Sequence, residues 1–339
     1  MGRSLTAILV AGPTWVGDMV MAQSLFQALR QRQPQVQIDV LAPAWSLPLL
    51  KYMPQVRAGI CSPFVHGQLG LRARWALGKS LRGQYEQAIT LPNSWKSALV
   101  PWAARIPQRT GWLGEARWGL LNDVRRLNKQ RLPQMVQRLV ALAQPPGATG
   151  VPEVSPPQLQ VTEAAVLAVL QQHPLVISAP VLALCPGAAY GPAKRWPAAS
   201  YAALAQHWLR QGGVVWLFGS GQDQPVCAEI QQQTSSVCAD LSDRLNLAET
   251  VALLSVATVV VSNDSGLMHV AAALNRPVVA LYGSTSPAFA PPLNQRHRIF
   301  YLNLACSPCR RRECPLGHLA CLQQIDVASV WDAVQELAA

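Results

Sequence analysis

Short apolar runs that end at glycine or proline recur in the first part of the chain, and each run predicts a buried strand. We expect strands over residues 6–11, 38–42 and 87–91. Between the first two, apolar residues recur at helical spacing from residue 18 to residue 31, and Pro34 then stops the pattern. A strand, a helix and a strand in this order predict parallel pairing with crossover helices.

The second part of the chain repeats this alternation more regularly. Strands are predicted over residues 181–185, 214–218, 259–262 and 278–282, and helices over residues 163–172, 201–211, 225–233, 248–256 and 267–274. The part between the third strand and residue 144 has weaker patterning, and residues 144–157 are dense in proline and glycine, as in a linker. We predict an α/β fold of two domains, residues 1–160 and 161–339, each with a parallel sheet, and a ligand cleft between them.

Composition narrows the class of protein. Half of the 339 residues are hydrophobic and 13% are charged, which suits two buried cores and excludes a disordered chain. No stretch of about 18 apolar residues occurs, and apolar residues 5–12 lead into no small-residue cleavage site. We therefore expect a cytoplasmic protein, in which the eight cysteines are thiols or metal ligands rather than disulfides.

The positive charge is confined to the first half. Residues 1–150 hold 18 lysines and arginines against 5 acidic residues, a net charge of +13, whereas the remaining residues have a net charge of −2. Such asymmetry predicts contact with a polyanion, namely nucleic acid, an anionic membrane or a phosphorylated substrate. The alternative is a surface charge that only keeps the protein soluble.

Four polar, glycine-containing segments follow predicted strands, and we expect them to surround one end of one sheet. In the first, residues 12–18 (Gly-Pro-Thr-Trp-Val-Gly-Asp), Asp18 stands at the start of a predicted helix. It fits a helix cap or a general base. A helix N-terminus stabilises a charged carboxylate, which weakens it as a base, so the pattern leaves both roles open.

The second segment, residues 185–197, combines Gly187 with the adjacent cations Lys194 and Arg195. Backbone amides and these cations could hold phosphate oxygens, although an ordinary surface loop has the same composition. The third and fourth segments, residues 262–269 and 282–287, place small polar residues before a helix and after a strand. Asp264 could be a helix cap and His269 a packed side chain, or the two segments could bind a diphosphate through Asn263, Asp264, Ser265, Gly266, His269, Ser284 and Thr285.

These segments resemble glycosyltransferase family 9, the ADP-heptose:lipopolysaccharide heptosyltransferases. The similarity extends over nearly the whole chain, in residues 12–21, 91–99, 109–115, 191–197 and 263–274, and it is strongest to the heptosyltransferase II branch. The resemblance implies a GT-B fold, in which two Rossmann-like domains face one another across a cleft. It also leaves open that the final helix packs back on the N-terminal domain.

The resemblance implies inverting transfer of heptose from ADP-L-glycero-β-D-manno-heptose onto the first heptose of the Kdo2–lipid A inner core, with no cofactor and no catalytic metal. Asp18 would be the base, Lys194 would contact the donor phosphates, and Asp264 with its loop would bind the donor sugar and diphosphate. The alternatives are another family 9 heptosyltransferase, adding the first heptose to Kdo or a later core heptose, and a basic nucleic-acid-binding protein. Against the latter, the 11 tryptophans are scattered and no nucleic-acid motif occurs.

The resemblance assigns the acceptor, an anionic lipid-linked oligosaccharide, to the basic N-terminal domain. Candidate contacts are Asn93, Lys96, Arg109 and Arg117, and neutralising the two arginines is expected to raise the acceptor KM. Because no amphipathic anchor is evident, we expect peripheral contact with the cytoplasmic face of the inner membrane through charge.

Four cysteines near the C-terminus have the spacing of metal ligands. Cys306, Cys309, Cys314 and Cys321 could hold a structural zinc ion, or they could be packed free thiols. The transfer chemistry requires no metal at this position.

Overall fold

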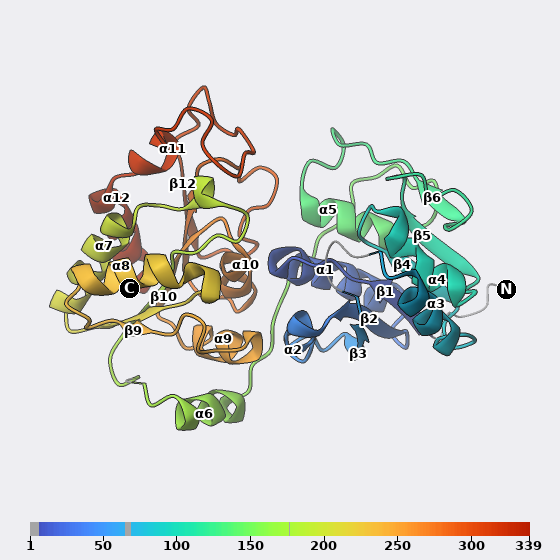
Figure 1. Ribbon diagram of the computed structural model, residues 1–339, viewed down its shortest axis with the longest axis horizontal. Coiled ribbons are helices and arrows are strands. Elements are labelled where there is room, and N and C mark those ends of the chain that lie inside the picture. The colour runs from blue at the N-terminus through green and yellow to red at the C-terminus, as the bar shows by residue number, and fades with distance from the viewer. Residues whose placement is uncertain (1–6, 65–68, 176) are drawn as a thin grey trace. The chain divides into compact units, whose positions relative to one another are not determined.

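The computed structural model describes residues 7–64, 69–175 and 177–339. Its contacts separate two compact units, Met1–Pro157 and Gln158–Ala339, which Figure 1 colours from blue to green and from green to red. The division lies close to the boundary predicted after residue 160. The segment rich in proline and glycine therefore ends the first unit.

The first unit is built on a parallel sheet with the strand order β3-β2-β1-β4-β5-β6. The chain order reverses between β1 and β4, and ligands of such sheets bind beyond the carboxyl ends of strands at this reversal. The strands are β1 (Ala7–Ala11), β2 (Gln37–Pro43), β3 (Val56–Ser62), β4 (Gln87–Thr90), β5 (Gln108–Trp112) and β6 (Asp123–Arg125), and the helices are α1 (Val16–Arg32), α2 (Leu47–Leu50), α3 (Leu71–Ser80), α4 (Leu99–Ala103) and α5 (Met135–Val140).

The second unit has the same architecture, with the strand order β12-β11-β10-β7-β8-β9 and a reversal between β7 and β10. Its strands are β7 (Val181–Cys185), β8 (Val214–Leu217), β9 (Ala239–Asp240), β10 (Val259–Asn263), β11 (Val278–Tyr282) and β12 (His297–Tyr301). Its helices are α6 (Glu163–Gln172), α7 (Ala198–Arg210), α8 (Gln224–Gln233), α9 (Leu247–Leu254), α10 (Gly266–Ala273), α11 (Ala320–Gln323) and α12 (Val327–Ala338).

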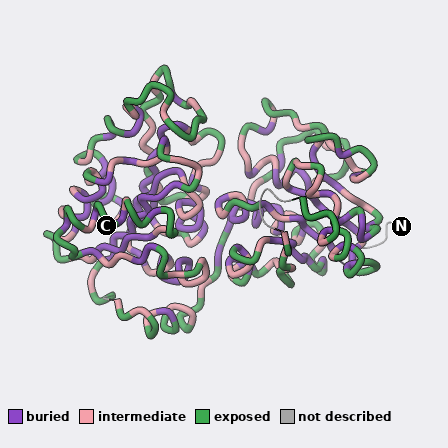
Figure 2. Tube along the Cα trace, in the orientation of Figure 1, coloured by how far each residue is buried: buried purple, intermediate pink, exposed green. Residues whose placement is uncertain are grey.

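The central strands are buried along their whole length, which is why the sequence shows them as continuous apolar runs. All five residues of β1, β7, β10 and β11 are buried. Parallel strands that are covered on both faces need apolar side chains in both directions. Figure 2 shows buried segments in purple inside each unit and exposed green segments at its outer helices and loops. The predicted α/β fold with two parallel sheets is confirmed.

The prediction of a weakly structured middle is wrong, because the chain between β4 and residue 144 contains β5 and β6. β5, Gln-Arg-Thr-Gly-Trp, has no apolar run and is built into the sheet by polar contacts. Gln87 Nε2 donates to Thr110 Oγ1 over 3.1 Å, and Thr110 Oγ1 donates to Asp123 Oδ2 over 2.9 Å. Hydrophobic periodicity cannot reveal a strand that is held by such a chain of hydrogen bonds.

The last helix, α12, packs into the core of the second unit, whereas the sequence left a return to the first domain open. Val330, Val334 and Leu337 are buried in that core. Their spacing of four and three residues places them on one face of the helix. Trp331 adds a stacking contact with His207 of α7 at a ring-centroid distance of 5.3 Å.

Helices α3 and α4 pack closely at a glycine, over the face of the first sheet that carries Leu9. A methyl group on Gly78 would lie 2.5 Å from Ala103 Cβ and 2.8 Å from the Val100 carbonyl oxygen. Arg82 Nε also donates to the Ala103 carbonyl over 3.1 Å. The position therefore has no room for a side chain.

We predict that Gly78→Ala lowers the free energy of unfolding by about 1–2 kcal/mol, because overpacking outweighs the roughly 1 kcal/mol that alanine gains over glycine in a helix. Denaturant unfolding monitored by circular dichroism measures this change. Gly150→Ala is the control, since a methyl group there would meet nothing within 4 Å. Equal stability of the two variants would show that α3 and α4 do not pack this closely.

Candidate functional site

An ion pair lies at the reversal of the second sheet. Asp264 directly follows β10, and Lys194 ends a short 3-10 helix, Pro192–Lys194, in the loop after β7. Lys194 Nζ donates to Asp264 Oδ2 over 2.6 Å and to the Asp264 carbonyl over 3.2 Å. Thr285 Oγ1, in the loop after β11, donates to the same Oδ2 over 2.6 Å. One carboxylate oxygen therefore joins three loops that the sequence predicts to bind a ligand.

The start of α10 shows whether Asp264 caps this helix. The N-cap of this helix is Ser265, and no side chain caps it. Asp264 is therefore no helix cap, and that interpretation of the sequence is wrong. Ser265 Oγ instead lies 3.1 Å from Ser262 Oγ, which fixes the turn between β10 and the helix.

Asn263 braces these loops from inside the protein. Its side chain is fully buried, and its Nδ2 donates to the Pro186 carbonyl over 2.7 Å. Its Oδ1 accepts hydrogen bonds from the Trp196 amide over 3.0 Å and from the Tyr201 hydroxyl over 3.1 Å. The amide group is thus engaged in positioning the loop after β7, and the donor contact assigned to it stays a prediction.

A second carboxylate holds the other predicted cation. Arg195 Nη2 donates to Asp223 Oδ1 over 3.3 Å, and the amide and hydroxyl of Ser220 donate to Asp223 Oδ2 over 3.0 and 2.8 Å. A methyl group on Gly187 would lie 2.3 Å from Asp223 Cγ, so this position requires glycine. The sequence interpretation missed Asp223, although Ser220-x-x-Asp223 after a predicted strand is the pattern of a helix start.

Among the described residues of this region, two buried polar atoms have no hydrogen-bond partner. They are Ser284 Oγ, in the loop after β11, and Arg195 Nε. Buried polar groups are normally paired, so each of these atoms has hydrogen-bonding capacity that a ligand could use. Both residues are among the predicted donor contacts.

In the first unit, Asp18 lies in the first turn of α1 rather than at its cap. The N-cap is Trp15, which makes no capping hydrogen bond through its side chain, so the interpretation of Asp18 as a cap is wrong. The preceding loop turns tightly because Gly12 approaches its neighbours closely. Its amide donates to the Leu41 carbonyl over 2.9 Å, and a methyl group there would lie 2.7 Å from Met19 Cε. The first helical turn favours the charged carboxylate.

This location corrects a further prediction. The segment 12–18 follows β1 of the first sheet, whereas the other three segments follow β7, β10 and β11 of the second sheet. The four segments therefore do not surround one end of one sheet. Each sheet carries its own set of polar residues at its chain reversal.

Asn93 and Lys96 lie in the loop after β4, which neighbours β1. Arg117 is 1% exposed and supports this loop from inside the protein. Its guanidinium donates to the Pro92 carbonyl over 2.7 Å and to the Trp112 carbonyl. Glu115 Oε2 accepts the Trp95 amide over 3.0 Å. Arg117 thus has a structural role, and its predicted contact with the acceptor stays a prediction.

Arg109 lies apart from these residues, toward the amino end of β5. Its side chain donates to the Leu120 carbonyl over 2.7 Å and to the Ile106 carbonyl over 2.6 Å. The loop with Asn93 and Lys96 lies at the carboxyl edge of the same parallel sheet. The structure therefore does not bring Arg109 together with the other candidate acceptor contacts.

Comparisons with known proteins identify the family of this chain. The model of the family described as Glycosyltransferase family 9 (heptosyltransferase) matches residues 74–320. The chain is 45% identical over 340 residues to lipopolysaccharide heptosyltransferase 2 of Escherichia coli strain K12, covering 97% of this chain and 98% of that protein. It is 49% identical over 307 residues to lipooligosaccharide heptosyltransferase 2 of Haemophilus influenzae, covering 87% and 88%.

The structure of E. coli ADP-heptose lps heptosyltransferase II superposes with a TM-score of 0.87 at 43% identity and covers 98% of both chains. The chain belongs to glycosyltransferase family 9. The resemblance found in the sequence is confirmed, and so is the prediction of a glycosyltransferase.

The loop that contains Cys306, Cys309 and Cys314 supports the ion-pair region of this family 9 enzyme. Residues 302–319 follow β12, and the Arg312 carbonyl accepts the Ala193 amide over 3.0 Å. The Arg310 amide donates to the Ser284 carbonyl over 2.7 Å. The loop thus holds two of the three loops that meet at Asp264.

The same loop adds cations that the sequence interpretation missed. Arg310, Arg311 and Arg312 are exposed, and the Tyr190 hydroxyl donates to the Arg310 carbonyl over 2.8 Å. Lys194 Nζ lies 5.2 Å and Arg312 Cζ 5.7 Å from the centroid of the Tyr190 ring. The run of three arginines after Cys309 was the signal available in the sequence.

The four cysteines of this region are close enough for their charges to act on one another. Burial, together with the charges of Cys306, Cys309 and Cys314, raises the pKa of the Cys321 thiol. The Leu319 amide and further backbone amides hold the pKa of Cys314 below its usual value. Within the residues that the structure describes, no three His, Cys, Asp or Glu side chains are arranged to hold a metal ion. Structural zinc stays a prediction, which metal analysis of the untagged protein tests.

His269, on α10, is buried beside the ion pair. Burial lowers its pKa to about 4, while the charge of Asp264 acts to raise it and that of Lys194 to lower it. The imidazole is therefore neutral at neutral pH. This agrees with the packed side chain that was one of its two interpretations.

We predict that His269 makes the folded protein less stable in acid. An unfolded histidine has a pKa of about 6.5, so below that pH the unfolded chain binds a proton that the folded chain does not. Stability is then lost as the pH falls toward 4, by about 2–3 kcal/mol at pH ~4.5. Denaturant unfolding at neutral pH and at pH ~4.5 should show this loss in the wild type and a smaller loss in His269→Asn.

His173→Asn, at a half-exposed position, controls for the removal of a histidine. An acid-induced loss of equal size in the wild type and in His269→Asn would contradict the assignment.

Proposed function

We propose that this glycosyltransferase moves heptose from ADP-L-glycero-β-D-manno-heptose onto the first heptose of the Kdo2–lipid A inner core. The observation that carries the proposal is the 45% identity to lipopolysaccharide heptosyltransferase 2 over 97% of the chain. The similar solved structure is described as an ADP-heptose lps heptosyltransferase II, which supports the same donor. The reaction would proceed with inversion at the anomeric carbon.

We infer that the Lys194 region of the second unit binds the diphosphate of the donor. Lys194 is held by the Asp264 carboxylate. A diphosphate carries more negative charge and would compete for the ammonium group. Lys194, Arg195 and the first amides of α10 would then stabilise the charge that develops on departing ADP, a term that often dominates such transfers. We propose that these groups suffice without a divalent metal or another cofactor.

Asp18 is the proposed general base. Its carboxylate would accept the proton of the acceptor hydroxyl as that oxygen forms a bond to the anomeric carbon and the bond to the diphosphate oxygen breaks. The position of Asp18 beyond the carboxyl end of β1, at the chain reversal of the first sheet, supports this role. The first helical turn keeps the carboxylate in the charged form that accepts a proton, although it also lowers its basicity. ADP leaves with the electron pair of the broken bond.

The first unit is proposed to bind the acceptor. Its net charge of +13 over residues 1–150 suits the phosphates and carboxylates of an inner-core oligosaccharide. Asn93 and Lys96, beside the β1–β4 reversal, remain the proposed contacts. Because the proposed acceptor is lipid-linked, we propose that the enzyme works as a peripheral protein at the cytoplasmic face of the inner membrane. We propose no nucleic-acid partner.

We predict ADP release from ADP-heptose with Kdo2–lipid A that carries one heptose, and none with Kdo2–lipid A that lacks it. A coupled assay for ADP measures both rates, and added EDTA should leave them unchanged. Release with the bare acceptor would instead identify transfer of the first heptose. No release with either acceptor would contradict the proposed donor.

We predict that Asp18→Asn lowers kcat by about 10²- to 10⁴-fold, because the amide cannot accept the proton. The donor KM should stay within about twofold of the wild type, since a base that acts in the transition state contributes little to donor binding. Asp332→Asn, an exposed change on α12, is the control and should leave both constants unchanged. A donor KM that rises while kcat holds would assign Asp18 to binding.

A further inference from the structure

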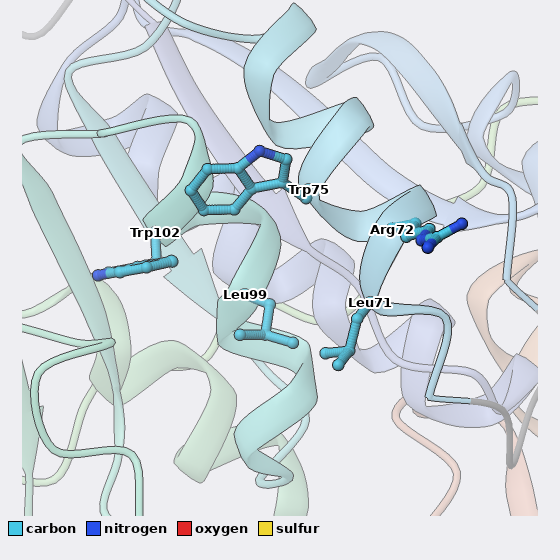
Figure 3. Close-up of a pocket in the computed structure, with 5 residues that line it drawn as sticks. All are labelled: Leu71, Arg72, Trp75, Leu99 and Trp102. Atoms are coloured by element: carbon cyan, nitrogen blue, oxygen red, sulfur yellow. The ribbon is translucent and has the colours of Figure 1, made fainter.

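Helices α3 and α4 carry an exposed apolar surface for which the transfer chemistry has no use. Leu71, Trp75 and Trp102 are 50%, 43% and 41% exposed. With Leu99 and Arg72 they line a shallow hollow of about 330 Å³. We call these five residues the α3–α4 patch. Figure 3 shows Leu71 and Trp75 on one helix, Leu99 and Trp102 on the other, and the Arg72 side chain pointing away from the hollow.

The patch is preformed. The ring centroids of Trp75 and Trp102 are 5.5 Å apart, so the two indoles contact one another across the helix pair. The close packing at Gly78 fixes the two helices beneath them. Exposed tryptophans in contact with one another on a rigid support offer apolar area without a large cost in side-chain entropy.

A lysine lies near one of the aromatic rings, and the two segments that form the helix pair contain basic residues but no acidic ones. Lys79 Nζ lies 5.6 Å from the centroid of the Trp75 ring. Arg74 is internal, since it is buried and donates to the Leu69 carbonyl over 2.7 Å. Residues 70–82 and 95–105 contain no Asp or Glu, and their basic residues are Arg72, Arg74, Lys79, Arg82, Lys96 and Arg105.

We propose that the α3–α4 patch docks this enzyme on an anionic lipid bilayer. Tryptophan rings favour the level of the lipid headgroups, and lysine and arginine beside them are attracted to anionic lipid. A second copy of the chain is a poorer occupant of the patch, because it would bring cations against cations. The proposal rests on the proposed function in that a lipid-linked acceptor lies in a membrane.

The sequence predicts that charge alone attaches the protein to the membrane, and the α3–α4 patch adds an apolar contact to this prediction. None of the helices in the described part of the chain is long and apolar enough to cross a membrane. The sequence shows no amphipathic anchor because the apolar residues of the patch are divided between two short helices, 71–80 and 99–103. Only the folded chain brings Trp75 and Trp102 together, and they add a hydrophobic contribution to the electrostatic one.

Co-sedimentation of the full chain with vesicles tests this surface. Vesicles of phosphatidylcholine mixed with phosphatidylglycerol should bind the wild type, and vesicles of phosphatidylcholine alone should bind it less. The double variant Trp75→Ala/Trp102→Ala should lower the partition coefficient about tenfold or more, because it removes the apolar contact. Arg72→Gln/Lys79→Gln should lower it about tenfold and reduce its dependence on salt.

Matched controls separate the patch from general effects. Trp118→Ala removes another tryptophan of the first unit, 67% exposed, and Arg210→Gln/Arg244→Gln removes two exposed cations of the second unit. Both controls should bind vesicles within about twofold of the wild type. The two charge variants change exposed side chains only, so they test the proposal even if the tryptophan variant fails to fold.

The outcomes separate the patch from the proposed function. Patch variants that bind vesicles as the controls do would overturn the proposal, and so would a dimer that depends on Trp75 without binding to vesicles. The rate of heptose transfer to a heptosylated Kdo acceptor that lacks its lipid should be the same in the patch variants and in the wild type. If the wild type binds vesicles through the patch but transfers no heptose, the proposed function fails and the docking surface stands.

Discussion

Parallel strands that are covered on both faces constrain where this protein can place polar groups. The strands β1, β7, β10 and β11 are buried throughout, so their side chains are almost entirely apolar. Next to these four strands, most of the polar candidate residues lie in the loops that follow the strands. The reversal of chain order opens a position between two of these loops in each sheet, and Asp18, Lys194 and Asp264 lie in loops or helix starts beside these reversals.

In the loops of the second unit, two carboxylates position the cations Lys194 and Arg195. Asp264 holds Lys194, and Asp223 holds Arg195, so neither cation depends on a ligand for its place. A preorganised cation loses little entropy when an anion binds, but the anion must compete with the carboxylate that already holds it. Affinity for the diphosphate would therefore reflect the difference between two charge-assisted contacts.

The sequence predicts the elements that are buried on both faces and the loops that follow them. The bounds that the sequence predicts for strand β7 and helix α6 agree with the structure at every residue. Lys194, Asp264 and Thr285 come from three loops that the sequence predicts to bind a ligand, and their side chains meet at the Asp264 carboxylate. Periodicity failed where polar contacts replace apolar ones, as at Thr110, and where apolar residues face solvent, as on α3. Residue type alone also does not reveal the role of Arg117, which is a candidate ligand contact because of its charge. Its guanidinium donates hydrogen bonds to backbone carbonyls inside the protein.

The contact between Ala193 and Arg312 has a consequence for synthesis of the chain. The loop that holds Lys194 receives its support from a segment that follows the last strand, so the region is assembled from the middle and the end of the sequence. A nascent chain lacks this support until residue 312 has left the ribosome. The loop with Lys194 therefore gains its full set of contacts only after the last strand of the second unit, β12, has been synthesised.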